Sequence, residues 1–248
     1  MGHLLISKLK SFALGLALLI IIWYLAYWII DRSVIPNPFL VLRTLPTLLE
    51  HNVASHFVHS LYRLFMALTL SMGIGLIVGL AAANKHFSKV LNPFIYFTYP
   101  IPRVALLPVV MLVFGLRDIS KIIMITLIVV YPIIIVVRDS VKDIPKEMYN
   151  TLICLGASKF QMFVFVTLPW AVSGILSTLR ISLGTAVAIL FFTEAYGTRY
   201  GMGFFVLDMW QRINYVLMFA GIVLLSMTGF ILFVFIDVLE EVLLKWKK

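Results

Sequence analysis

The sequence predicts an all-α membrane protein with about six transmembrane helices, and its composition and hydropathy carry this prediction. Of the 248 residues, 62% are hydrophobic and 12% are charged, and the mean hydropathy is +1.06. Soluble domains are about 45–50% apolar with about a quarter of their residues charged, so a water-soluble core of this size would lack a polar shell. Apolar stretches of about 20 residues, which cross a bilayer as helices, recur along the chain. The composition also excludes a disordered chain, and the single cysteine, Cys154, excludes an intramolecular disulfide.

Six stretches match the length of a transmembrane helix, and together they make residues 1–248 a single transmembrane domain. Lys8 and Lys10 precede the first stretch, which is longer than the apolar region of a signal peptide and lacks a small-residue cleavage site, so we expect it to be retained. The fourth stretch is short, and Lys121 and Arg138 can extend from its two ends to the membrane surfaces. The predicted spans are 12–30, 64–84, 91–116, 122–137, 171–193 and 216–236.

The third predicted span differs from the others because prolines interrupt it. Proline lacks a backbone donor and clashes with the preceding turn, so this helix must be kinked or broken. Irregular backbone inside a membrane is tolerated only against protein or water. Arg103 therefore either borders a cavity or extends to the inner membrane face, and both alternatives stay open. The prolines in this span are Pro93, Pro100, Pro102 and Pro108.

The distribution of basic residues predicts that both termini are cytoplasmic. An even number of spans places the termini on one side of the membrane, and the segments assigned to that side carry eleven Lys and Arg residues against seven on the other. Cytoplasmic loops are the ones that carry such an excess. The net charge of +9 is spread between the apolar stretches and forms no basic stripe of the kind that binds nucleic acid, so anionic membrane lipid is the expected counter-charge.

The sequence shows no catalytic or metal-binding constellation. It lacks the G-x-x-x-x-G-K loop of nucleotide-hydrolysing proteins, so we expect no ATP hydrolysis by this chain and no cofactor bound to it. His56 and His59 are spaced for one helix face but lack a third aligned ligand, so we expect no metal site. Four small residues spaced four apart predict close helix packing instead. They are Ala67, Ser71, Gly75 and Gly79.

Residues 145–169, between the fourth and fifth spans, follow the pattern helix, glycine, helix, proline. Pro145 and Glu147 favour a helix start. Gly156 favours a chain reversal, and Pro169 is expected to stop the second helix. The second helix carries an apolar stripe at the i, i+3, i+4 spacing. A short amphipathic element of this kind either rests on lipid or fits into the groove of a partner protein.

This loop resembles the cytoplasmic loop of permease subunits of ATP-binding-cassette (ABC) importers, whose pattern is E-A-A-x3-G-x9-I-x-L-P. With Gly156 in the glycine position, Leu168 and Pro169 fall on the final leucine and proline. Val166 falls on the isoleucine position. The three positions of the E-A-A triad depart from the pattern. They are Asn150, Thr151 and Leu152.

Other segments, spread over most of the chain, resemble the nitrate/sulfonate/taurine branch of these permeases. The resemblance rests on the order in which these segments occur along the six predicted spans. They are Ile35-Pro36-Asn37-Pro38 with Val41, Ser60-Leu61-Tyr62-Arg63, residues 101–108 with Phe114-Gly115 and Lys121, Leu179-Arg180, Glu194, and Gly201-Met202-Gly203.

The resemblance implies an importer subunit of the prokaryotic cytoplasmic (inner) membrane that works with other proteins. Two permease copies would form the substrate pathway, two cytoplasmic ATPase subunits would use ATP and Mg, and an extracytoplasmic substrate-binding protein would deliver the solute. The implied solute is a small organic or inorganic anion, such as a sulfonate or nitrate, or a vitamin precursor. Each ATPase subunit would receive one coupling loop. The residues expected to make this contact are Asn150, Thr151, Leu152, Gly156, Ala157, Phe160 and Pro169.

Three charged residues in or next to the spans are candidates for the transport site. Arg180 shares a stripe of small or polar residues with Ser177 and Gly184. Such a charge must face protein or water, so it either lines the pathway or pairs with a carbonyl or acid of another helix. Arg103 is a second pathway candidate. Glu194, at the outer end of the fifth span, is expected to be a gate, a contact for the binding protein or a solvated loop acid.

Two other classes of membrane protein compete with the importer subunit. A self-contained secondary transporter or channel coupled to protons or sodium would need acidic residues deep in several spans. The charged residues within the predicted spans are instead both basic, Arg103 and Arg180. A membrane enzyme would need a clustered catalytic set at the interface, and Asp139 and Asp143 alone do not supply one.

Overall fold

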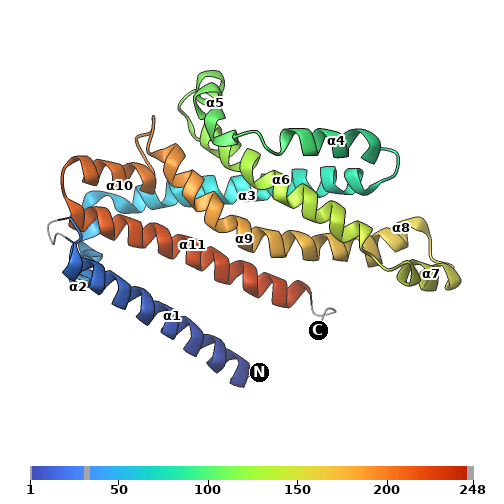
Figure 1. Ribbon diagram of the computed structural model, residues 1–248, viewed down its shortest axis with the longest axis horizontal. Helices are drawn as coiled ribbons and strands as arrows, with labels where there is room; N and C mark the ends of the chain where they lie inside the picture. Colours follow the sequence, from blue (N-terminus) through green and yellow to red (C-terminus); the bar gives the residue numbers. More distant parts are fainter. Residues whose placement is uncertain (1, 31–33, 245–248) are drawn as a thin grey trace.

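The computed structural model describes residues 2–30 and 34–244, and every regular element in these two ranges is helical. Long helices extend between two ends of the molecule, with α2 and α10 at one end and α7 and α8 at the other (Figure 1). We call these the α10 end and the α7 end. The all-α prediction is confirmed. The elements are α1 (Gly2–Ile29), α2 (Pro38–Thr44), η1 (Pro46–His51), α3 (Val53–Ala83), α4 (Ser88–Thr98), η2 (Arg103–Leu106), α5 (Leu107–Phe114), α6 (Asp118–Lys142), α7 (Lys146–Cys154), α8 (Lys159–Met162), η3 (Phe163–Thr167), α9 (Leu168–Glu194), α10 (Met202–Gln211) and α11 (Tyr215–Leu243).

Several of these helices are long and apolar enough to cross a membrane. Among the described residues four helices meet this criterion, and they are Val53–Ala83, Asp118–Lys142, Lys159–Glu194 and Tyr215–Leu243. The bent pair of α4 with η2 and α5 adds a fifth if it counts as one span, and the apolar part of α1, Leu14–Ile29, is shorter. The chain is therefore a multi-pass membrane protein, and the count of six spans stays a prediction.

The core of the bundle is the contact between α3 and α6, with α9 packed against both helices. The small residues that the sequence assigned to helix packing are all buried in this contact. Gly79 lies so close to α6 that a Cβ atom built on it would stand 2.6 Å from Cβ of Val137. The packing prediction for these small residues is confirmed, because they allow the two backbones to approach.

We expect Gly79→Ala to lower the apparent melting temperature of the purified protein, whereas Gly73→Ala does not. The added methyl at Gly79 must displace Val137, and overpacking a core costs about 1–3 kcal/mol. Gly73 lies in the same helix with nothing within 4 Å of a built Cβ, so its substitution provides the matched control. Thermal unfolding in detergent measures both variants. Equal melting temperatures would contradict the α3–α6 packing described above.

The third predicted span is broken, as its prolines require. The α4 helix ends at Thr98 and η2 begins at Arg103, and the two halves are bent by 85°. Between them Pro100 and Pro102 have no N–H group to satisfy, and the N–H of Ile101 donates to the carbonyl of Thr98. The break therefore leaves few backbone donors without a partner.

The expectation that Pro169 stops a helix is wrong, because a single helix runs from Lys159 to Glu194. Proline removes a donor and crowds the carbonyl four residues earlier. The chain absorbs this through the π-helical segment η3, where the N–H of Leu168 donates to the carbonyl of Phe163, five residues back. At 1.5 Å per residue this helix is about 54 Å long, and it connects the α7 end with the α10 end.

Candidate functional site

The predicted loop at the α7 end folds as two short helices joined by a glycine. The α7 helix follows Pro145 and has Glu147 in its first turn. At its end Gly156 has φ of +77°, its N–H donates to the carbonyl of Ile153, and the N–H of Ala157 donates to the carbonyl of Leu152, both at 3.0 Å. This is the Schellman arrangement, which places glycine in the left-handed position. The chain reversal expected at Gly156 is confirmed.

The start of α8 carries a capping box that was not predicted from the sequence. The side chain of Ser158 accepts from the N–H of Gln161, and the side chain of Gln161 accepts from the N–H of Ser158 at 2.7 Å. This capping box was readable in the sequence as Ser-x-x-Gln. Together with Gly156, it fixes both sides of the turn.

The loop exposes apolar side chains. Leu155 is 77% exposed, Phe160 is 74% exposed and Ile153 is 56% exposed. The hydroxyl of Tyr149 is hydrogen-bonded to Oγ1 of Thr167 at 2.9 Å, which ties α7 to the long helix. An apolar surface on a tied helix pair is suited to a hydrophobic groove. Of the remaining predicted contact residues, Asn150 and Thr151 are exposed, whereas Leu152, Ala157 and Pro169 are half-buried.

Arg180 pairs with acids of a neighbouring helix rather than standing free on a stripe. Its guanidinium forms ion pairs with Asp237 and Glu240 of α11, and a third of its side chain is exposed. This pairing with acids of another helix is one of the two alternatives expected for Arg180, and its role in lining the pathway stays a prediction. Ser177 is half-buried and Gly184 is exposed on the same helix. The two acids were not predicted as partners because the predicted sixth span ends at residue 236, whereas α11 continues to Leu243.

We expect Arg180→Met to lower the apparent melting temperature more than Glu240→Gln does. The first substitution removes the cation that Asp237 and Glu240 share, whereas the second keeps that cation and removes one of its two acids. Like charges without a counter-charge repel most strongly where water is scarce. Thermal unfolding of both variants in one detergent gives the order, and the reverse order would contradict this role of Arg180.

Arg103 holds the break in the third span. Its Nη2 donates to the carbonyl of Tyr99 at 3.1 Å and to that of Thr98 at 3.4 Å, which satisfies the last carbonyls of α4. Its guanidinium also lies over the ring of Tyr131 of α6, 3.7 Å from the centroid. The side chain of Arg103 thus caps the C-terminal end of α4 and packs it against α6. Its role in lining a pathway stays a prediction.

Glu194 is completely buried, at 0% exposure, and lies in a network of polar side chains. Its carboxylate accepts from Nη1 of Arg63 at 2.7 Å, from Oγ of Ser60 at 2.7 and 2.8 Å, and from the N–H of Gly203 at 2.9 Å. A side chain without exposed surface is not a solvated loop acid, so this expectation for Glu194 is wrong. Its roles as a gate or as a contact for the binding protein stay predictions.

Arg63 and Lys121 extend this network across the α10 end. Arg63 also donates to Oδ1 of Asp118 at 2.6 and 2.8 Å and to the carbonyl of Tyr200 at 2.7 Å. The ammonium of Lys121, 0% exposed, donates to the carbonyls of Leu116 and Gly197 at 2.6 and 3.2 Å. We call Ser60, Arg63, Asp118, Lys121 and Glu194 the polar cluster.

The polar cluster was not predicted from the sequence because Arg63 and Lys121 lie outside the predicted spans. In the structure α3 begins at Val53 and α6 begins at Asp118, so both side chains belong to helices. A span predicted from hydropathy ends where charged residues begin. Paired charges at the ends of a helix therefore fall outside the predicted span. Among the described residues no group of three or more His, Cys, Asp or Glu side chains is placed to hold a metal ion.

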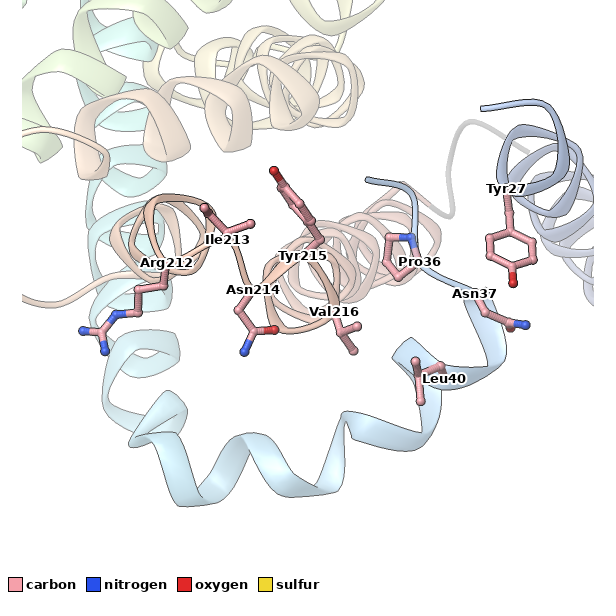
Figure 2. A pocket seen from close by; sticks show the side chains of 9 residues that line it. All are labelled: Tyr27, Pro36, Asn37, Leu40, Arg212, Ile213, Asn214, Tyr215 and Val216. Atoms are coloured by element: carbon pink, nitrogen blue, oxygen red, sulfur yellow. The ribbon is translucent and has the colours of Figure 1, made fainter. Parts of the chain in front are cut away.

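A cavity of about 480 Å³ also lies at the α10 end. Figure 2 shows Tyr27 on one side of it and Arg212 on the opposite side. Nε of Arg212 is already paired with Asp208 at 3.0 Å. The cavity therefore offers little free charge to a ligand. The lining residues are Tyr27, Pro36, Asn37, Leu40, Arg212, Ile213, Asn214, Tyr215 and Val216.

Known transport proteins resemble this chain in sequence. It is 29% identical to the putative aliphatic sulfonates transport permease protein SsuC of Bacillus subtilis over 93% of this chain and 85% of that protein. It is 29% identical to the taurine transport system permease protein TauC of Escherichia coli over 97% of this chain and 91% of that protein. It is also 29% identical to the formylaminopyrimidine transport permease protein ThiX of Halalkalibacterium halodurans over 93% of each chain.

Solved structures resemble the chain in fold. A chain of the MetNI methionine ABC transporter in inward-facing conformations superposes with a TM-score of 0.61 at 16% identity, covering 77% of this chain and 95% of that one. The family model described as binding-protein-dependent transport system inner membrane component matches residues 71–245, which is more than half of the chain. The protein therefore belongs to the binding-protein-dependent transport system inner membrane components, as an ABC importer permease of the nitrate/sulfonate/taurine branch.

Proposed function

We propose that two copies of this chain form the substrate pathway of an ATP-driven importer of a small solute. The observation that carries the proposal is the loop at the α7 end, which exposes Ile153, Leu155 and Phe160 on a turn held by Gly156. Each copy places this loop in a groove of a separate ATPase subunit. ATP and Mg are used in those subunits, and this chain contributes no cofactor site.

A protein groove suits this loop better than lipid does. Charged side chains flank the apolar residues, namely exposed Lys146 and Glu147 on α7 and Lys159 on α8. Such charges stay in water, so the apolar residues between them project into an aqueous compartment. A hydrophobic groove on a partner removes about 25 cal/mol of unfavourable free energy for each Å² of apolar surface that it covers.

The pathway is proposed to run between the two copies, next to the broken third span. Residues 99–102, which carry the break, are exposed in the single chain. Irregular backbone at membrane depth must lie against protein or water. A second copy supplies the protein surface, and the pathway between the two copies supplies the water. The exposed face of α9 at Gly184 and Thr185, with Ser177 half-buried beside it, offers a close approach to that copy.

The proposed orientation places the α7 end and both termini in the cytoplasm. Exposed lysines gather at this end of the chain, as cytoplasmic loops require. The α10 end then faces the outside, where a substrate-binding protein delivers the solute. These lysines are Lys85, Lys89, Lys142, Lys146 and Lys159.

The proposed solute is a small organic or inorganic anion, such as a sulfonate or nitrate, or a vitamin precursor. The relatives are described as permeases for aliphatic sulfonates, taurine and formylaminopyrimidine, and these names support both chemical classes. In this arrangement the binding protein selects the solute, and the permease conducts it.

Uptake by whole cells tests the proposal. Cells with and without this chain are given labelled taurine, an alkanesulfonate, nitrate or a formylaminopyrimidine in turn. We expect the chain to confer uptake of one of these solutes, and we expect ATP depletion to abolish this uptake while a protonophore added with ATP maintained leaves it intact. Chain-dependent uptake that survives ATP depletion and stops with the protonophore would instead identify a self-contained secondary transporter.

A further inference from the structure

We propose that the cavity at the α10 end binds the headgroup of phosphatidylethanolamine, a zwitterionic phospholipid, from the surrounding membrane. The cavity lies between α1, the start of α2 and the turn that joins α10 to α11 (Figure 2). The α4 and α5 helices of the broken span lie on the opposite side of the molecule (Figure 1). The lipid site is therefore independent of the proposed function, because a ligand there is remote from the proposed pathway.

The cavity lies where apolar helices end, which is the depth of lipid headgroups. Tyr27 lies in the last turn of α1, whose apolar part ends at Ile29, and Tyr215 is the first residue of α11. Two tryptophans next to these positions are exposed, Trp28 by 66% and Trp210 by 55%. Tyrosine and tryptophan are enriched at the level of the headgroups. The headgroups of one leaflet are thus the molecules that surround the cavity.

The cavity lining presents hydrogen-bond donors of the kind that a phosphate group accepts. Oδ1 of Asn37 caps the first turn of α2 at 2.8 Å, and Oδ1 of Asn214 caps that of α11 at 3.2 Å. Each asparagine therefore keeps an Nδ2 amide group that has no acceptor among the described residues. Nη1 and Nη2 of Arg212 also have no acceptor within this part of the chain, because the ion pair with Asp208 uses Nε.

The pair of Arg212 with Asp208 matches a ligand that carries both charges. The side chain of Arg212 is 67% exposed and that of Asp208 is 26% exposed, so both still have accessible surface. The guanidinium binds the phosphate, and the carboxylate accepts from the ammonium group. Phosphatidylglycerol lacks the ammonium group, and the methylated nitrogen of phosphatidylcholine has no N–H to donate. Phosphatidylethanolamine is therefore the headgroup that uses both members of the pair.

Ile213 has a strained backbone at the edge of the cavity. Its φ is +57°, its N–H donates to the carbonyl of Trp210 at 3.0 Å, and the N–H of Asn214 donates to that of Met209 at 2.9 Å. This is the position of a Schellman turn that glycine favours, and a β-branched residue is an outlier there. The side chain is 72% exposed, so the protein itself gives it little burial. The acyl chains of a lipid in the cavity cover this side chain and remove its apolar surface from water.

Native mass spectrometry of the purified protein tests the lipid site. The protein is stripped of co-purified lipid in mild detergent and titrated with phosphatidylethanolamine, phosphatidylglycerol or phosphatidylcholine of identical acyl chains. A fourth titration uses glycerophosphoethanolamine, which is the same headgroup without acyl chains. The variants are Arg212→Gln and Asp208→Asn, with Arg43→Gln as the matched control, because Arg43 is an exposed arginine at the same end that does not line the cavity. Thermal unfolding of each stripped variant confirms that it is folded.

We expect phosphatidylethanolamine to bind at least about tenfold more tightly than the other two lipids, and the soluble headgroup alone to form no adduct. Arg212→Gln should weaken this binding by about tenfold, because it removes a charge-assisted hydrogen bond. Asp208→Asn should abolish the preference over phosphatidylglycerol, and Arg43→Gln should leave the affinity unchanged. Equal binding of the three lipids, or equal losses with Arg212→Gln and Arg43→Gln, would show adventitious lipid only and overturn the site. Adducts with the soluble headgroup would assign the cavity to a solute and overturn it as well.

Discussion

Replacing Arg63 with Met is expected to lower the free energy of unfolding by about 3–5 kcal/mol, which is the cost of leaving one partner of a buried ion pair alone. Glu194 has 0% exposure and loses its cation, while Asp118 loses its partner on α3. The loop carbonyl of Tyr200 also loses one of its two donors and keeps the hydroxyl of Thr198. Thermal unfolding in detergent, followed by the fluorescence of the five tryptophans, measures the loss as a lowered apparent melting temperature.

Two further variants make this prediction specific. Arg43→Met removes an exposed arginine at the same end, so its melting temperature should match that of the unsubstituted protein. The double variant Arg63→Met/Glu194→Met removes both buried charges and should recover part of the loss, since an apolar pair avoids the uncompensated charge. A double variant that is as unstable as the sum of the two single variants would contradict the direct pairing of Arg63 with Glu194.

Replacing Leu155 with Glu is expected to weaken the binding of the ATPase subunit by about 30-fold, because an apolar anchor in an interface groove contributes about 2 kcal/mol. Leu155 stands at the turn between α7 and Gly156 and is 77% exposed, so the substitution leaves the fold of the permease unchanged. Binding of the purified ATPase subunit to immobilised permease gives the dissociation constants.

Phe87→Glu is the matched control for this second prediction. Phe87 is also at the α7 end and is 61% exposed, but it lies in the connection between α3 and α4. We expect its variant to bind the ATPase subunit as tightly as the unsubstituted permease does. If both substitutions weaken binding equally, the contact is not specific to the predicted loop.

Local features of this protein were predictable from the sequence because their causes are local. Gly156 was identified as a chain reversal, since a glycine between two helical patterns is suited to the left-handed position that closes a helix. The broken third span followed from its prolines, and the close packing of α3 followed from small residues spaced four apart, although this spacing did not indicate α6 as the partner. The Ser158–Gln161 capping box was equally local and was missed although its pattern is present.

The polar contacts between distant segments were not predictable from spacing. Arg63 and Glu194 are 131 residues apart, and Arg180 and Glu240 are 60 apart. Nothing in a helical period indicates which residues of two helices will face each other. The charges also lie near helix ends, where a hydropathy criterion stops the span before it reaches them.

Pro169 illustrates a different limit. A proline favours a helix end when it is considered alone, but the π-helical segment before it supplies an extra residue that relieves the clash. Packing of the long helix decides between the two outcomes, because α9 lies against α3, α6 and α11. Tertiary contacts therefore override the local preference at this position.

The subunit composition of the purified protein shows whether this chain is one part of an ATP-driven assembly. The tagged chain is purified from its native membrane in mild detergent and analysed by native mass spectrometry. We expect a complex of two permease copies with two ATPase subunits. A lone chain or a homo-oligomer that still moves solute without ATP would contradict it.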